Sequence, residues 1–132
     1  MNREIKFRAL VKTSSKMIEV QGVTENFVFE NTLNGCDPNE NVFSRKDCLL
    51  MQFTGLSDMN GKEIYEGDIV IPTDNNCEPY FTHSQVIVEW SDEICGFKLG
   101  HVSNTMSIYY KYEVIGNIFE NPEMLLVTQA IT

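Results

Sequence analysis

The chain opens with apolar and polar residues in alternation, which is typical of a strand with one buried face. In the run EIKFRALVK (residues 4–12), the apolar residues of one face are Ile5, Phe7, Ala9 and Val11. The opposite face is basic, and only Leu10 interrupts it. After the polar segment at residues 13–16, apolar residues resume at Met17. The pattern therefore predicts an N-terminal β-hairpin.

Further along the chain, the same periodicity predicts four more strands. They cover residues 49–53, 85–90, 96–99 and 108–119. Gly116 marks a bulge or break in the last of these. Residues 44–53 fit a helix or a strand equally well, and the nearby glycine of TGL favours the strand. Residues 21–41 are dense in turn formers and are interpreted as a surface loop, although 27–29 could form a short strand.

The C-terminal segment NPEMLLV predicts a short helix. Asn121 can accept a hydrogen bond from a free amide of the first turn, and Pro122 suits the first helical position. The predicted fold is mainly β: a small SH3-like barrel with an N-terminal β-hairpin and a short C-terminal helix. We expect one domain over residues 1–132, with the hairpin and loop in 1–48 and the barrel plus terminal helix in 49–127.

Residues 54–70, TGLSDMNGKEIYEGDIV, hold three glycines and four acidic residues. A phosphate loop requires four residues between its glycines and a hydroxyl-bearing residue after the lysine. In this run, five residues separate the two glycines, and the lysine is followed by Glu63. A calcium loop fails because Gly61 and Glu66 fall at the wrong positions. The remaining interpretation is that this run forms turns. Asn60-Gly61 would supply the two positive-φ residues of a tight hairpin turn. A second corner at 66–68 would let Asp68 accept backbone amides.

Composition narrows the function classes. The chain has 132 residues and a net charge of −9, which argues against direct binding to a nucleic-acid backbone. No apolar run is long enough for a membrane span, and the first residues do not resemble a signal peptide, so we expect a cytoplasmic protein. The acidic surface would meet a basic protein, imitate DNA, or simply maintain solubility.

The four cysteines favour free thiols over a zinc site, because they contain no close pair. They are Cys36, Cys48, Cys77 and Cys95. His83 and His101 each stand alone, and we expect no metal, no cofactor and no catalytic residue. The carboxylates of Glu63, Glu66 and Asp68 are interpreted as turn residues, with a metal-dependent enzyme as the alternative. The candidate partner-binding residues are Tyr65, Asp68 and Trp90.

Three blocks of the chain resemble the YopX-like family of phage and prophage proteins. They are REIKFRA at residues 3–9, LMQFTGLSDMNGKEIYEGDIV at 50–70, and YEVIGNIFENPEML at 112–125. The resemblance implies an accessory protein of a bacterial host cytoplasm with no established activity. It also implies a homo-oligomer, with a trimer as one form.

Three classes of function follow. The leading hypothesis is a non-enzymatic module that binds a protein partner, with an acidic DNA mimic or inhibitor of a nucleic-acid-binding protein as its variant. The second class is a metal-dependent enzyme. The third is a self-associating structural component.

Overall fold

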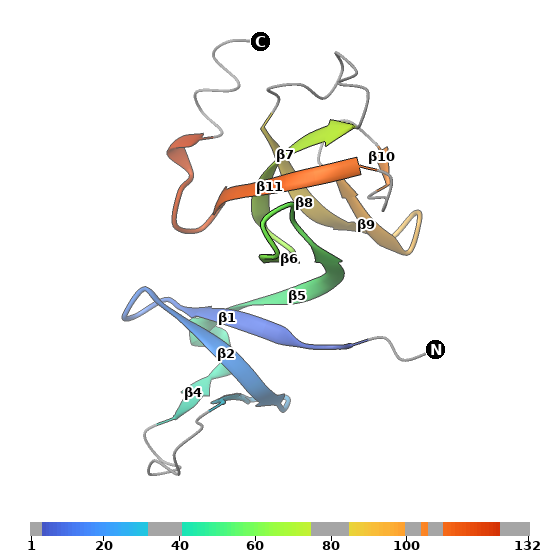
Figure 1. The fold of residues 1–132 in the computed structure, drawn as a ribbon. Coiled ribbons are helices and arrows are strands. Elements are labelled where there is room, and N and C mark those ends of the chain that lie inside the picture. Colours follow the sequence, from blue (N-terminus) through green and yellow to red (C-terminus); the bar gives the residue numbers. More distant parts are fainter. Residues whose placement is uncertain (1–3, 32–40, 75–84, 100–103, 106–109, 125–132) are drawn as a thin grey trace. The chain divides into compact units, whose positions relative to one another are not determined.

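The computed structural model describes residues 4–31, 41–74, 85–99, 104–105 and 110–124, and strands dominate them (Figure 1). The prediction of a mainly β protein is confirmed. The chain divides into two compact units, Met1–Phe53 (unit 1) and Thr54–Thr132 (unit 2). Each unit is described by itself below. Within the described residues, no helix has the length and apolar character needed to cross a bilayer.

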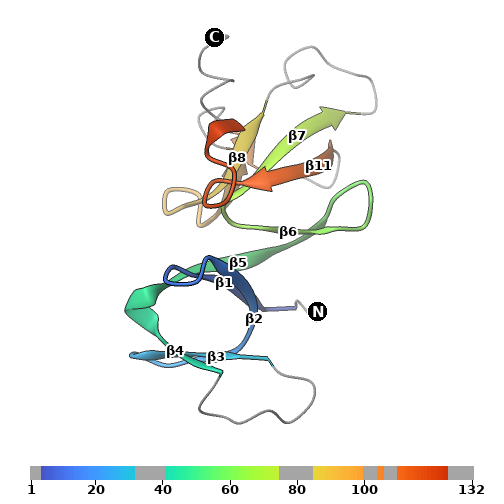
Figure 2. The same cartoon turned by 90° about the vertical axis from the view of Figure 1, so that its left-hand side faces the viewer.

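Unit 1 is an antiparallel sheet in the order β4-β3-β2-β1-β5. Its elements are β1 (Phe7–Val11), β2 (Lys16–Val23), β3 (Phe27–Glu30), β4 (Val42–Ser44), the 3-10 turn η2 (Arg45–Asp47) and the first part of β5 (Cys48–Ser57). Figure 2 shows these strands following a curved path from β5 and β1 round to β3 and β4. The curvature gives the sheet a concave face on which a small core can form.

The core of unit 1 confirms the predicted N-terminal hairpin. Ala9 pairs with Ile18 across β1 and β2, and both side chains are buried. The cluster consists of Ala9, Val11, Ile18, Val28 and Cys48, with Val20, Phe43 and Leu50 packed against it. Leu10, on the other face of β1, is buried as well. Its burial agrees with the predicted interruption of the basic face at Leu10.

The surface loop predicted for residues 21–41 is wrong over its first part, because β2 extends to Val23 and β3 begins at Phe27. Cross-strand pairing of β2 with β3 and burial of Val28 outweigh the turn-forming composition of this segment. A β-bulge between Val20 and Gly22 shifts the register of the two strands. Residues 32–40 lie outside the described residues. The strand predicted at 49–53 is confirmed within the longer β5, after the short turn η2.

Unit 2 contains the end of β5, its neighbour β6 and a five-stranded antiparallel sheet in the order β10-β9-β8-β7-β11. The elements are β6 (Glu63–Tyr65), β7 (Asp68–Asp74), β8 (Val86–Ser91), β9 (Gly96–Leu99), β10 (Asn104–Thr105) and β11 (Tyr110–Asn117). The core consists of Ile64, Val70, Val86, Val88, Phe97, Leu99 and Tyr112. β11 lies beside β7 (Figure 1), and its register shifts between Val114 and Gly116, which confirms the predicted bulge.

Two finer features of the predicted fold are not confirmed. The five-stranded sheet is open rather than a closed SH3-like barrel, because β10 and β11 form its two edges in the described part of the chain. The C-terminal helix is described only at residues 123–124, where the Met124 amide donates to the Asn121 carbonyl at 3.2 Å. Its expected apolar face at residues 125–126 lies outside the described residues.

Candidate protein-binding surfaces

The turn after β5 is organised by the buried carboxylate of Asp58, which sequence reasoning did not single out. Oδ1 accepts the amides of Asn60 and Lys62, both at 2.8 Å, and Oδ2 accepts the amide of Val114 at 3.0 Å. Burial alone would raise the pKa of Asp58, but these three amides stabilise the carboxylate and hold its pKa below the usual range. Asp58 therefore joins the turn to β11.

The two predicted corners are real, with one change at the first. Gly61 has φ of +82°, whereas Asn60 is not a positive-φ residue. The turn therefore contains one left-handed residue instead of the predicted two. It is closed by the Gly61 amide, which donates to the Asp58 carbonyl at 3.0 Å. The second corner is confirmed, because Gly67 has φ of +88° and Asp68 Oδ2 accepts the Tyr65 amide at 2.8 Å.

The three candidate partner-binding residues occupy different environments. Tyr65 and Asp68 are buried, with exposed fractions of 8% and 1%, and the Tyr65 amide joins them. Trp90 is 43% exposed on β8. The partner-binding role of all three stays a prediction, and Trp90 is the one whose side chain a protein partner can reach.

Trp90 packs against the unit 2 core while leaving part of its indole exposed. Its ring meets Phe97, its partner across β8 and β9, edge to face with centroids 5.3 Å apart. Its Nε1 donates to Asp92 Oδ1 at 2.8 Å, which fixes the ring orientation. Ile94 in the adjoining turn is 48% exposed, and Glu93 is also exposed. Trp90, Asp92, Glu93 and Ile94 are called the Trp90 surface below.

The charge of the chain is distributed unequally between the two units. Residues 1–53 hold seven Lys or Arg residues and seven Asp or Glu residues, so unit 1 is formally neutral. Residues 54–132 hold three Lys residues and twelve acidic residues, so unit 2 carries the whole net charge of −9. The Trp90 surface therefore belongs to the acidic unit, and a positively charged partner would be attracted to it.

Of the cysteines and histidines considered for metal or redox chemistry, the structure describes Cys48 and Cys95. In the described ranges, no group of three or more His, Cys, Asp or Glu side chains could hold a metal ion. Cys48 is buried, and burial together with nearby Asp47 raises its pKa, although Lys12 lowers it. Cys95 is an exposed free thiol. Both histidines and the other two cysteines lie outside the described residues.

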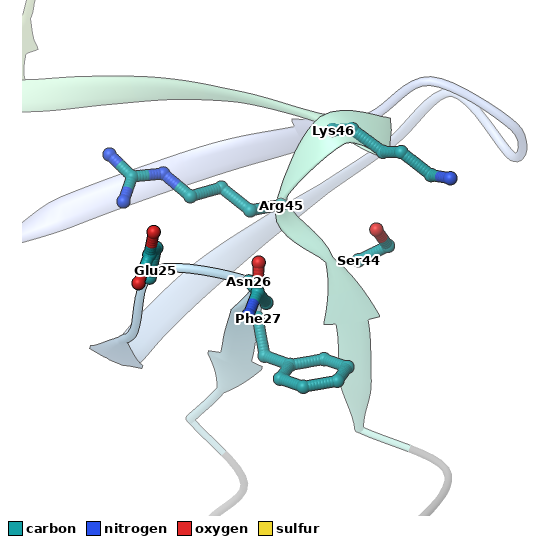
Figure 3. A pocket seen from close by; sticks show the side chains of 6 residues that line it. All are labelled: Glu25, Asn26, Phe27, Ser44, Arg45 and Lys46. Atoms are coloured by element: carbon teal, nitrogen blue, oxygen red, sulfur yellow. The ribbon is translucent and has the colours of Figure 1, made fainter.

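A second surface feature lies in unit 1, in the region expected to be a loop. It is a pocket of about 360 Å³ lined by Glu25, Asn26, Phe27, Ser44, Arg45 and Lys46 (Figure 3). The Arg45 amide donates to the Asn26 carbonyl at 2.9 Å, which holds η2 against the β2–β3 turn. In the sequence, only the FVF run at 27–29 hinted at this site, because the pairing of β3 with β4 joins segments that are separated along the chain.

The three blocks identified in the sequence lie in these two units, and comparison with known proteins agrees with them. The YopX protein family matches residues 6–126. The chain belongs to the YopX family. Among solved structures, this YopX-family chain is similar to protein EF1440 from Enterococcus faecalis, with 26% sequence identity and a TM-score of 0.68. That similarity covers 94% of this chain and 99% of the other. The search of curated proteins found no match to this chain.

Proposed function

We propose that this YopX-family protein is a non-enzymatic accessory protein of a phage or prophage that binds a basic protein in the bacterial cytoplasm. The observation that carries this proposal is the half-exposed, oriented indole of Trp90 on the unit that holds all of the net negative charge. Exposed tryptophan is enriched among the residues that dominate binding energy at protein interfaces.

The chemistry of the Trp90 surface suits a partner that presents arginine or lysine. An indole face attracts a cation, and the contribution is about 0.5–1 kcal/mol at an exposed site. Asp92 and Glu93 are exposed beside it and add charge complementarity. Ile94 supplies apolar area at the edge of the same surface. A more specific version of the proposal is that the partner binds in a groove like that of an SH3 domain.

Affinity capture from lysogenic or infected cells tests the proposal. Wild-type protein is compared with Trp90→Ala, Glu93→Lys and Phe27→Ala, where Phe27 is a similarly exposed aromatic residue of unit 1. We expect a specific basic protein to be retained at low salt by wild type and Phe27→Ala, and to be lost from the other two variants. Retention that is equal in all four proteins, or no specific retention at any salt, would refute the proposal.

The second candidate function is an acidic DNA mimic that inhibits a nucleic-acid-binding protein. The concentration of all net charge in unit 2 favours it. Double-stranded DNA should then displace the captured protein in a competition experiment, whereas it would leave a simple protein-binding complex intact.

The proposal also includes self-association into a homo-oligomer, with a trimer as the specific form. Light scattering across a range of protein concentrations tests it. A mass equal to one chain at every concentration would count against it. Metal analysis and turnover assays of the same purified protein address the enzyme alternative.

A further inference from the structure

We propose that unit 1 carries a second docking surface, separate from the Trp90 surface and opposite in charge, which binds a short acidic peptide segment containing a large apolar side chain. The surface consists of the pocket beside Phe27 together with Lys12, and it is called the Phe27 pocket below. This inference goes beyond the proposed function, because it concerns another unit and another class of partner.

The first argument comes from the cations. Lys12, Arg45 and Lys46 are all exposed, and Lys12 Nζ donates to the backbone carbonyl of Lys46 at 3.1 Å, which brings the Lys12 ammonium to the turn that carries Arg45 and Lys46. Among the residues that the structure describes, no carboxylate lies within ion-pair distance of any of the three. By contrast, Lys6 and Lys16 do form ion pairs. In a chain with only ten cations, such a cluster indicates an anionic ligand.

The second argument comes from the apolar side of the site. Phe27 is 48% exposed and lies opposite Ser44 in the register of β3 and β4. Phe29 and Val42 are paired two residues along the same strands, so they share the face of Phe27 and are half-buried. An apolar strip therefore leads from the sheet to the cationic corner. A ligand that fills both parts needs an apolar side chain as well as carboxylates.

The third argument is that the Arg45 side chain is held in a fixed position. Arg45 Nη1 donates to the Thr24 carbonyl at 3.2 Å, so the long side chain is held before any ligand arrives. A guanidinium has five N–H donors, and fixing the group in advance lowers the entropic cost of binding. Figure 3 shows Arg45 extending over the Glu25 side of the pocket and Lys46 pointing to the other side. Arg45 and Lys46 therefore offer a cation on each side of the pocket.

The volume and the overall charge favour a short peptide over a nucleic acid. About 360 Å³ lies at the lower end of the roughly 300–1,000 Å³ of typical ligand pockets, which suits a few residues. A polyanion gains affinity by contacting many cations along its backbone, and this surface offers three in a chain of net charge −9. An acidic peptide satisfies the three cations and the aromatic ring together.

Fluorescence polarisation with a defined probe tests the inference. The probe is a short fluorescein-labelled peptide of alternating glutamate and phenylalanine, and its controls are the same peptide with lysine for glutamate, and inorganic phosphate. We expect saturable binding of the acidic probe, weakened at least about tenfold by Lys46→Glu and by Phe27→Ala, equivalent to about 1.4 kcal/mol. The matched controls are Lys62→Glu, an exposed lysine of unit 2, and Trp90→Ala, and both should bind as wild type does.

Three outcomes of this experiment would refute the inference. It is refuted if the wild type does not bind the probe, if Lys46→Glu binds as well as Lys62→Glu, or if phosphate competes as effectively as the unlabelled acidic peptide. Circular dichroism of each variant verifies the fold. Because Lys46 is exposed and is not part of the core cluster, Lys46→Glu tests the site even if Phe27→Ala unfolds. Loss of binding to the basic partner in Trp90→Ala leaves this result unaffected, so the two proposals can fail separately.

Discussion

Replacing Asp58 with alanine should destabilise unit 2 more than removal of any exposed carboxylate. Asp58 is 7% exposed, and its two oxygens accept three backbone amides. Hydrogen bonds to a charged group contribute about 1.5–3 kcal/mol each, but water can reach the amides of Asn60 and Lys62 once the side chain is gone. The Val114 amide, 56 residues away on the half-buried β11, has poorer access to water. We therefore expect a loss of about 2–4 kcal/mol.

Urea unfolding followed by tryptophan fluorescence measures this loss, because Trp90 is the single tryptophan and lies in the same unit. With a denaturant slope of about 2 kcal/mol per molar, the midpoint should fall by roughly 1–2 M. Asp92→Ala is the matched control, since Asp92 is exposed and its carboxylate accepts only the Trp90 indole N–H in the described residues. Its midpoint should move by a few tenths of a molar. Equal midpoints for the two variants would refute the reasoning.

The pH dependence provides an independent check of the same group. The pKa of Asp58 is lower in the folded chain than its ordinary value of 3.8, so the unfolded state takes up the proton first. The stabilisation is therefore complete above pH 3.8 and is lost as the pH falls through the lower, folded-state pKa. Wild-type stability should decline more steeply than that of Asp58→Asn in this acid range. Parallel curves would contradict the assignment.

Two further changes test the packing of β11 and the state of the thiols. Gly116→Ala would place a Cβ 2.6 Å from Asn121 Oδ1, which must then release the Asn117 amide, so urea unfolding should show a loss of about 1 kcal/mol. In an Asn121→Gly background, which already lacks both the clash and this hydrogen bond, Gly116→Ala should cost little further stability. A cost of Gly116→Ala that is as large in the Asn121→Gly background as in the wild type would contradict this. With the other two cysteines changed to serine, exposed Cys95 should react with a thiol reagent at least about tenfold faster than buried Cys48, whose pKa is raised by burial. Equal rates would show that Cys48 is accessible.

The sequence predicted the strands and corners that depend on local chemistry. Gly67 and Asp68 behave as expected, because a positive φ and a carboxylate that accepts a nearby amide are properties of neighbouring residues. The bulge near Gly116 was predicted for the same reason. Asp58 was missed as an anchor, because its bond to Val114 joins segments far apart in the chain.

The candidate surfaces were harder to predict, because exposure is a property of the folded chain. Trp90 continues the alternating pattern of β8 like a core residue, yet it lies at the end of the core and remains half-exposed. Phe27 follows a stretch rich in turn formers, so its strand was assigned to a loop. Only the pairing of β3 with β4 brings Arg45 beside it. No local periodicity carries that information.

The pairing of β7 with β11 has a consequence during protein synthesis. β7 ends at Asp74 and its partner begins at Tyr110, so the ribosome must add about 40 residues before the two strands can meet. At translation rates of about 5–20 residues per second, that interval lasts roughly 2–8 s. During this time, one edge of a strand rich in aliphatic residues has no native neighbour, and such an edge is open to pairing with other nascent chains. Expression at low temperature or with chaperones should therefore raise the yield of folded protein.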